Sequence, residues 1–345
     1  MRRKASALDS EGEETTGEGT ADPEPEEGAS PRRGRERREK WYRSGWFEPV
    51  LALLIILVLL LGAYGYTQNW PPLVVVESGS MQHGTQDIPG LINAGDIVLP
   101  QRVPVPSGVT TYVQGEQTGY TSYGEYGNVI LYYPNGNTAA TPVVHRALLW
   151  LNYLPSQGTF AAPSLAGLTC GPGGQYVLEE GPLGSSCVSP NDPNAAITGS
   201  IELLRVGWES VNVTIDLGNL AQESPWSGYI TLGDNNGATY DQSGGCIISC
   251  IVQAPWVWGV ARGMIPWFGA LKLLVEGYGY RVPSLSWVYM GVVILALGVA
   301  LTVGPWLYRR RRGGRGTTDG EGTGDPRATA DPETPRSTRK DRGGP

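Results

Sequence analysis

The chain has 345 residues, with 33 acidic against 26 basic side chains and a formal net charge of −7. Residues 67–286 are the most acidic part, with 15 Asp and Glu against 6 Lys and Arg. Nucleic-acid binding requires a basic face, so this balance argues against a nucleic-acid partner.

The N-terminal part predicts a solvated tail followed by a membrane span. Residues 1–45 are rich in Glu, Gly, Pro and Arg and hold almost no large aliphatic side chains, which predicts a disordered tail. Residues 50–66 form an uncharged apolar run. Extended back to Trp46, with Glu48 at its edge, the run 46–66 has about the 20 residues that a helix needs to cross a bilayer. A cleaved signal peptide is the alternative, but the long leader and the lack of an Ala-x-Ala site count against it.

A second uncharged run, 287–308, predicts a second transmembrane helix. Trp287, Trp306 and Tyr308 lie at its ends, where interfacial aromatic residues gather. Basic residues precede the first span, and four arginines (309–312) follow the second. Because positive flanks stay in the cytoplasm, both termini are expected inside and residues 67–286 outside, in a multi-pass protein of the cell membrane. The tail 309–345 is again expected to be disordered.

Residues 67–286 predict an antiparallel β domain, so the fold class is mainly β, with two transmembrane anchors and disordered cytoplasmic tails. Short β-branched and aromatic runs alternate with turn signals such as Pro134-Asn135-Gly136. The expected strands are Leu73–Glu77, Asp96–Leu99, Asn128–Tyr133, Pro142–Leu151, Glu202–Val206, Val211–Ile215 and Gly228–Leu232. Residues 255–283, rich in Trp, Pro and Gly, fit either an interfacial segment or a core strand followed by a loop.

Residues 151–200, rich in Gly, Pro and Ser, indicate an insertion whose role the sequence does not assign. Four cysteines lie outside the membrane in this topology, and the simplest pairing is Cys170–Cys187 and Cys246–Cys250. Four cysteines allow three pairings. A zinc site is the competing interpretation, although no Cys-x-x-Cys spacing is present.

Ser80 ends the apolar run that begins at Val74, just beyond the first span, and is the candidate nucleophile. A serine hydroxyl needs a neighbouring base. The chain has two histidines, His83 and His145, and one lysine between the two spans, Lys272. Histidine, with a pKa of about 6.5 in water, is better poised as a base than lysine, at about 10.4. His145 could equally be a structural histidine, and His83 could be an exposed turn residue.

Two carboxylates, Asp234 and Asp241, could orient such a histidine. They lie in the segment 231–241, whose Asn-Gly pair also fits a hairpin turn. A calcium loop is a further possibility, but the spacing does not match an EF-hand.

In this order the motifs resemble signal peptidase I of the archaeal and endoplasmic-reticulum type, in which histidine replaces the bacterial lysine. The likeness covers about residues 74–269 without the insertion. It is carried by the following motifs: Ser78-Gly79-Ser80-Met81, Gly95-Asp96-Ile97-Val98, His145-Arg146, and Gly233-Asp234-Asn235-Asn236 with Asp241. The Gly-x-Ser-x-Gly elbow of α/β-hydrolases is not met.

The resemblance implies a membrane-bound serine endopeptidase that removes signal peptides from preproteins. It makes Ser80 the nucleophile and His145 the general base, with Asp241 orienting the histidine and Asp234 as a second acid or structural partner. Ser78 and the Ser80 N–H become candidates for the oxyanion hole. No cofactor or metal is implied, the partners are signal peptides and membrane lipid, and accessory secretion subunits are left open. Asp96 is expected to be a strand or turn determinant.

Three departures from that family's pattern qualify the resemblance. His83 stands where many members have proline. The gap between Asp234 and Asp241 is slightly longer than is usual in that family, and the segment between His145 and Asp234 is much longer. A catalytically inactive β domain that binds protein partners is the rival interpretation, and a membrane esterase is a further one.

Overall fold

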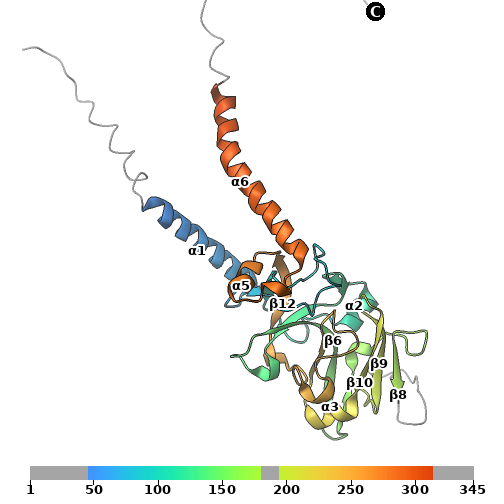
Figure 1. The fold of residues 1–345 in the computed structure, drawn as a ribbon. Coiled ribbons are helices and arrows are strands. Elements are labelled where there is room, and N and C mark those ends of the chain that lie inside the picture. The colour runs from blue at the N-terminus through green and yellow to red at the C-terminus, as the bar shows by residue number, and fades with distance from the viewer. Residues whose placement is uncertain (1–45, 180–193, 314–345) are drawn as a thin grey trace, which may run out of the picture. The chain divides into compact units, whose positions relative to one another are not determined.

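The computed structural model describes residues 46–179 and 194–313 (Figure 1). The predicted tails 1–45 and 314–345 lie outside these ranges, as does Cys187 and therefore the predicted Cys170–Cys187 pair. Cys170 is disulfide-bonded.

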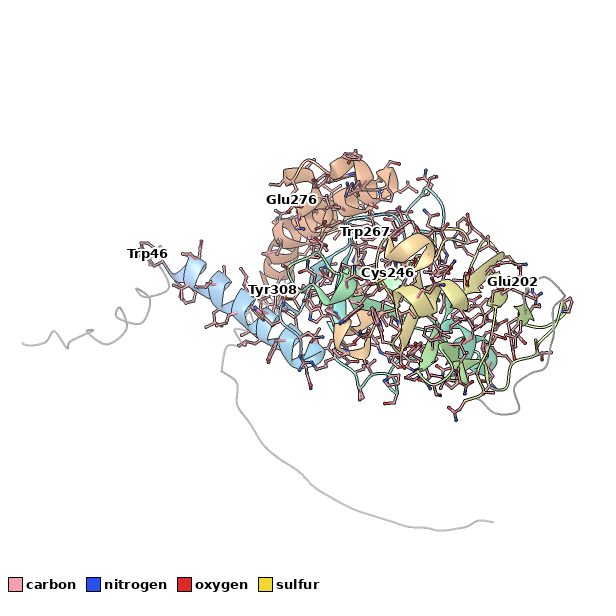
Figure 2. The ribbon with its side chains drawn as sticks, turned by 90° about the horizontal axis from the view of Figure 1, so that it is seen from below. Trp46, Glu202, Cys246, Trp267, Glu276 and Tyr308 are labelled. Atoms are coloured by element: carbon pink, nitrogen blue, oxygen red, sulfur yellow. A yellow bond between two sulfur atoms is a disulfide. The ribbon has the colours of Figure 1, made fainter. Side chains whose placement is uncertain are left out.

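Two helices are long and apolar enough to cross a membrane. They are α1 (Phe47–Thr67) and the segment Ser284–Tyr308 of α6 (Ser284–Gly313). Both predicted spans are therefore confirmed as apolar helices, although α6 continues through residues expected to begin the tail. Trp46, just before α1, is 78% exposed, and its side chain stands out from the ribbon in Figure 2. Aliphatic side chains exposed all around a helix are typical of a membrane environment.

An antiparallel seven-stranded sheet carries most of the segment between the two helices. Its order is β1-β2-β12-β5-β6-β11, and β7 pairs with β6. The strands are β1 (Val74–Val75), β2 (Ile97–Gln101), β5 (Val129–Tyr132), β6 (Val143–Leu154), β7 (Thr159–Ala161), β11 (Gly228–Leu232) and β12 (Val257–Ile265). The predicted antiparallel pairing is confirmed.

The long strand β6 lies at the centre of this architecture. It pairs with β5 over Val143–Arg146 and with β11 over Arg146–Leu151. Leu148, Leu149 and Leu151 are buried in the main hydrophobic cluster, so β6 has apolar neighbours on both faces. The burial of this strand fixes its register, because a one-residue slip would turn every side chain to the other face.

A separate three-stranded sheet, in the order β10-β9-β8, follows β7. It consists of β8 (Tyr176–Glu179), β9 (Ser200–Val206), which carries Glu202 in Figure 2, and β10 (Val211–Asp216). The helix α3 (Leu217–Glu223) comes next, with the side chain of Asp216 accepting a hydrogen bond from Asn219 N at its start. The sheet thus uses strands on both sides of residue 200, where the insertion was expected to end.

Short elements connect the sheets. They are α2 (Tyr112–Thr118), β3 (Thr121–Ser122), β4 (Glu125–Tyr126), η1 (Pro134–Gly136), η2 (Pro163–Leu165), α4 (Ser243–Cys246), η4 (Ala254–Trp256), α5 (Ala270–Val275) and η5 (Gly279–Arg281). A capping box between Thr111 and Gln114 begins α2, and Gly119 ends it in the left-handed conformation. Of the two interpretations of residues 255–283, the structure has a strand, β12, followed by a loop and the short helix α5.

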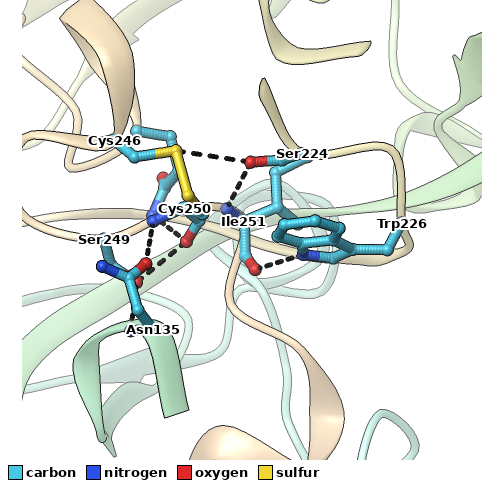
Figure 3. Close-up of a disulfide and its surroundings, with 8 residues drawn as sticks. Asn135, Ser224, Trp226, Cys246, Ser249, Cys250 and Ile251 are labelled. Atoms are coloured by element: carbon cyan, nitrogen blue, oxygen red, sulfur yellow. Dashed lines mark hydrogen bonds between the residues drawn. A yellow bond between two sulfur atoms is a disulfide. The ribbon is translucent and has the colours of Figure 1, made fainter. Parts of the chain in front are cut away.

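The loop after Asp241 is closed by a disulfide between Cys246 and Cys250, which confirms that predicted pair (Figure 3). Ser224 Oγ accepts from Ile251 N at 3.3 Å, and Trp226 Nε1 donates to Ile251 O at 2.9 Å. Because two of the four thiols form this bond, a zinc site built from all four is ruled out.

Candidate active site

Ser80 and His145 meet at one end of the seven-stranded sheet. Ser80 lies in a turn shortly after β1, and His145 is the third residue of β6. The Ser80 Oγ is 2.8 Å from His145 Nε2, within hydrogen-bond distance. Two groups separated by 65 residues in the chain are therefore placed as a nucleophile and a base require.

Asp241 contacts the other nitrogen of the same imidazole. Its Oδ1 and Oδ2 lie 2.8 Å and 2.7 Å from His145 Nδ1. An ionised carboxylate only accepts hydrogen bonds, so Nδ1 carries the proton and Nε2 is left as an acceptor for the Ser80 hydroxyl. This is the tautomer that a general base needs.

The Asp241 carboxylate is buried, and two hydroxyl groups satisfy it. Tyr132 OH donates to Oδ2 at 2.7 Å, and Thr231 Oγ1 donates to the same oxygen at 2.6 Å. Burial, followed by the Asp241 charge, raises the pKa of Tyr132 well above its usual value, so this phenol keeps its proton. Gln242 Nε2 in turn donates to Thr231 Oγ1 at 3.1 Å.

The loop that follows β11 holds the Ser80 turn. Asn235 N donates to Ser80 O at 2.8 Å, and Asn235 Nδ2 donates to Gly79 O at 3.1 Å. At Gly233 a Cβ atom would lie 2.7 Å from Ser80 O and 2.9 Å from His145 Nε2. Glycine is thus required here for steric reasons, because the backbone passes directly beside both groups.

Asp234 binds Arg146 and makes no contact with the His145 imidazole among the interactions of the described residues. Arg146 Nε and Nη2 donate to its two oxygens at 2.8 Å and 2.6 Å, a bidentate pair. Burial raises the pKa of Asp234, but Arg146 and then His83 outweigh it, and the net shift is downward. The two aspartates of one loop therefore have different partners.

Arg146 is almost fully buried and also binds backbone. Its Nη1 lies within hydrogen-bond distance of four carbonyl oxygens, those of Ser122, Glu125, Tyr126 and Gly127. The guanidinium therefore joins the β3–β4 hairpin to the Asp234 loop. Its neighbour in the chain, His145, faces the nucleophile on the opposite side of the strand, as alternation requires.

The two other candidate bases lie elsewhere. His83 Nε2 is 3.2 Å from Asp234 Oδ2. Lys272 Nζ pairs with Glu77 at 2.6 Å and with Glu276 at 3.4 Å. The hydrogen bond to Glu77 raises the pKa of Lys272, which keeps it a charged ammonium and unsuited to accept a proton.

Ser78 and Asp96 complete the set of residues expected from the sequence. Ser78 Oγ is 3.2 Å from Ser80 Oγ, so a second hydroxyl lies beside the nucleophile. Asp96 is buried, and its carboxylate accepts from Asn93 N at 2.8 Å and Trp267 N at 2.9 Å. It joins the turn before β2 to the loop after β12.

A cleft of about 430 Å³ opens beside the Ser80–His145 pair. One wall is formed by Val75–Ser78 and the other by Thr141–His145, and Ser80, Asn236, Ile248 and Arg281 also line the cleft. The pairing of β11 with β6 ends at Arg146, so no described strand lies beside Val144 on that side. The cleft therefore lies between two strand edges.

Models of known protein families do not match this chain, and neither does any curated protein compared with it. In the described ranges no group of three or more His, Cys, Asp or Glu side chains is arranged to hold a metal ion.

Sequence reasoning missed Tyr132, Thr231 and Gln242, the residues that support Asp241. Tyr132 and Thr231 are ordinary strand residues in the sequence, and their contact with Asp241 spans 109 and 10 positions respectively. The one available signal was that Tyr132 and Thr231 carry hydroxyl groups within otherwise apolar strands, where a buried hydroxyl needs a partner. The partnership of Arg146 with Asp234 was also missed, although both belong to quoted motifs.

Proposed function

We propose that this chain is a membrane-bound serine endopeptidase of the signal peptidase I type, which removes signal peptides from exported preproteins. The hydrogen-bonded series Ser80–His145–Asp241, of which Ser80 and His145 line an open cleft, carries the proposal. A nucleophile, a base in the required tautomer and an orienting carboxylate are the parts that acyl transfer by serine needs.

In this proposal an extended substrate adds as a strand between the cleft walls. Val76 exchanges backbone hydrogen bonds with Gly95 and Asp96, so by alternation Val75 and Glu77 present their backbone groups away from β2. On the other wall, Ala147 N donates toward β5, so Val144 presents its groups away from β5. Backbone pairing gives affinity without sequence preference, and side-chain pockets select small residues near the cut.

His145 takes the proton of Ser80 as the hydroxyl attacks the scissile carbonyl carbon and a tetrahedral intermediate forms. The Ser80 N–H and the Ser78 hydroxyl donate to the developing oxyanion. The proton on His145 then passes to the leaving amine, which yields an acyl-enzyme at Ser80. Water, deprotonated by His145, attacks the ester. As the bond to Ser80 Oγ breaks, His145 returns the proton to that oxygen and the new carboxylate is released.

The two apolar helices suit such a substrate, because a signal peptide lies in a bilayer. Both termini face the cytoplasm in this proposal, and the sheets lie on the outer side. Partners are preprotein signal peptides and membrane lipid.

Processing of a preprotein by the full chain in liposomes tests the proposal. Ser80→Ala and His145→Ala are each expected to abolish cleavage while the protein stays folded and inserted. Ser107→Ala, at an exposed serine in another loop, serves as the matched control. Full processing by Ser80→Ala, or none by the unaltered chain, would instead favour a β domain that only binds protein partners.

A further inference from the structure

The three-stranded sheet β10-β9-β8 reaches the candidate active site through the turn between β9 and β10. That turn consists of residues 207–210, because Val206 pairs with Val211. Gly207 N donates to Tyr112 OH at 3.0 Å, and Ser210 N donates to Gly207 O at 3.0 Å. The turn is thus fixed to α2 at its first residue, and Trp208 projects from it.

Trp208 contacts both the Asp234 loop and the Ser80 turn. Its Nε1 donates to Asp234 O at 3.0 Å. Its ring stacks on the imidazole of His83, with centroids 5.6 Å apart and planes 14° apart. His83 lies three residues after Ser80, so one indole links the two loops that meet at the nucleophile.

The other surroundings of His83 hold its ring in place. Its Nε2 faces Asp234 Oδ2 at 3.2 Å, and its side chain is only 10% exposed. A Cβ atom at Gly124, in the β3–β4 turn, would lie 3.2 Å from His83 Cε1. Since the Asp234 carboxylate only accepts hydrogen bonds, Nε2 of His83 carries the proton, the opposite tautomer to that of His145.

We propose that Trp208 and His83 are positioning residues, through which the three-stranded sheet holds the Ser80 turn against the Asp234 loop. The inference rests on the proposed function and assigns a role to the three-stranded sheet, of which only β8 lies well inside residues 151–200. The β9–β10 turn packs closely against the Arg146–Asp234 pair. The cavity between them is only about 10 Å³, and Gly207 and Val211 are among the residues that line it.

Substitution of Trp208 tests the inference in the full chain. Trp208→Leu is expected to lower kcat about tenfold with KM little changed, because it removes one hydrogen bond and one ring stack without touching the cleft. Trp208→Phe keeps the stack but lacks the N–H, so a smaller loss is expected. His83→Ala combined with Trp208→Leu should cost less than the sum of the two single losses, since the two rings share the stacking contact.

The matched control is Trp226→Leu. Trp226 also donates its indole N–H to a backbone carbonyl, that of Ile251 at 2.9 Å, and its ring contacts Trp256, so this hydrogen bond and this ring contact both lie outside the Ser80 turn and the Asp234 loop. A kcat for Trp208→Leu within twofold of the unaltered chain, or an equal loss in the control, overturns the inference.

Histidine NMR reports on the contact without any substrate. The chain has only two histidines, so ¹⁵N labelling resolves both rings. Trp208→Leu should displace the His83 resonances by removing the ring current, and Trp226→Leu should not. Unmoved His83 resonances overturn the inference.

Failure of the proposed function can be told apart from failure of this inference. Should the unaltered chain not process preproteins, the rate at which a fluorophosphonate modifies Ser80 takes the place of kcat. A slower reaction in Trp208→Leu than in Trp226→Leu supports the inference, and equal rates overturn it. An unreactive Ser80 contradicts the proposed function, and the His83 resonances then decide the inference.

Discussion

Asp234 and Asp241 are seven residues apart and both have buried side chains, yet their partners give them different tasks. Asp241 binds the imidazole of His145 and two hydroxyls, whereas Asp234 neutralises the buried guanidinium of Arg146. Loss of the Asp241 carboxylate should change the tautomer of His145, and loss of the Asp234 carboxylate should destabilise the fold. The sequence placed both acids in one motif but could not divide their roles, because each role depends on a side chain about 90 positions away.

Asp241→Asn is expected to lower kcat by about 10³- to 10⁴-fold, because a neutral amide no longer favours the proton on Nδ1 of His145. The free energy of unfolding should fall by only about 1 kcal/mol, since the amide keeps the shape of the carboxylate. Steady-state kinetics and denaturant unfolding measure the two effects. A variant with near-normal kcat would remove Asp241 from the mechanism.

Asp234→Asn is expected to lower the free energy of unfolding by about 3–5 kcal/mol, because Arg146 would remain buried without its counter-charge. The depressed pKa of Asp234 has the same origin, so its stabilising effect is present above the unfolded pKa of about 3.9 and is lost as pH falls through the lower folded value. Thermal unfolding measures the loss. An unchanged midpoint would show that the ion pair contributes nothing net.

Seven strands were predictable because each is a short β-branched or aromatic run bounded by turn residues, whereas β3, β4, β7 and β8 were not predicted. Gly228–Leu232 is observed with the predicted bounds, and Val211–Ile215 differs by one residue. The loop from Gly233 to Asp241 was not predictable in this way. Its Asn-Gly pair suggested a hairpin, and Asn236 N and Thr239 N do donate within the loop, to Gly233 O and Asn236 O. The bond from Asn235 N to Ser80 O, distant in the sequence, also determines its path. The capping box at Thr111 was a local signal for α2 that went unused.

Gly233→Ala tests how closely this loop must approach the nucleophile. The added Cβ would push against Ser80 O and His145 Nε2, and a misplacement of about 1 Å can cost about 100-fold in rate. We therefore expect kcat to fall by about that factor. Gly173→Ala is the control, because a Cβ there would meet no atom within 4 Å. Equal activity of the two variants would contradict the proposed role of Gly233.

Asp96 connects β2 to the loop after β12 and makes the fold sensitive to pH. Burial raises its pKa to about 6, against backbone N–H donors from Trp267 and Asn93 that lower it, and the nearby charge of Asp87 raises it further. The folded chain therefore binds the proton more tightly than the unfolded chain, where an aspartate titrates near about 3.9. The stabilising effect of this proton is fully present below that value and is lost as pH rises to about 6.

Asp96→Asn should flatten this pH dependence, which amounts to about 3 kcal/mol for the unaltered chain. Denaturant unfolding of the full chain in detergent micelles between pH 4 and 7 measures it. If the free energy of unfolding falls equally in the unaltered chain and in Asp96→Asn between pH 4 and 7, the Asp96 carboxyl is not the source of the pH dependence.

For the molecule as a whole, the apolar runs and the order of the motifs could be identified in the sequence. Which residues contact each motif in the folded chain could not. Hydropathy alone predicted both helices, because a bilayer span demands a long uncharged run. Ser286 at the start of α6 donates to the buried Asp87 at 2.6 Å. No sequence pattern predicted this link between the helix and the loop. The contact of the three-stranded sheet with the site, through Trp208, was equally hidden because the turn residues 207–210 carry no recognisable motif.

Mass spectrometry of the full chain after exposure to a fluorophosphonate tests the central claim most directly, because only an activated serine reacts readily with such a reagent. The Ser80–His145–Asp241 arrangement predicts one covalent adduct, on Ser80, at a rate that falls sharply in His145→Ala and Asp241→Asn. An unmodified Ser80, or one modified equally fast without His145, would contradict it.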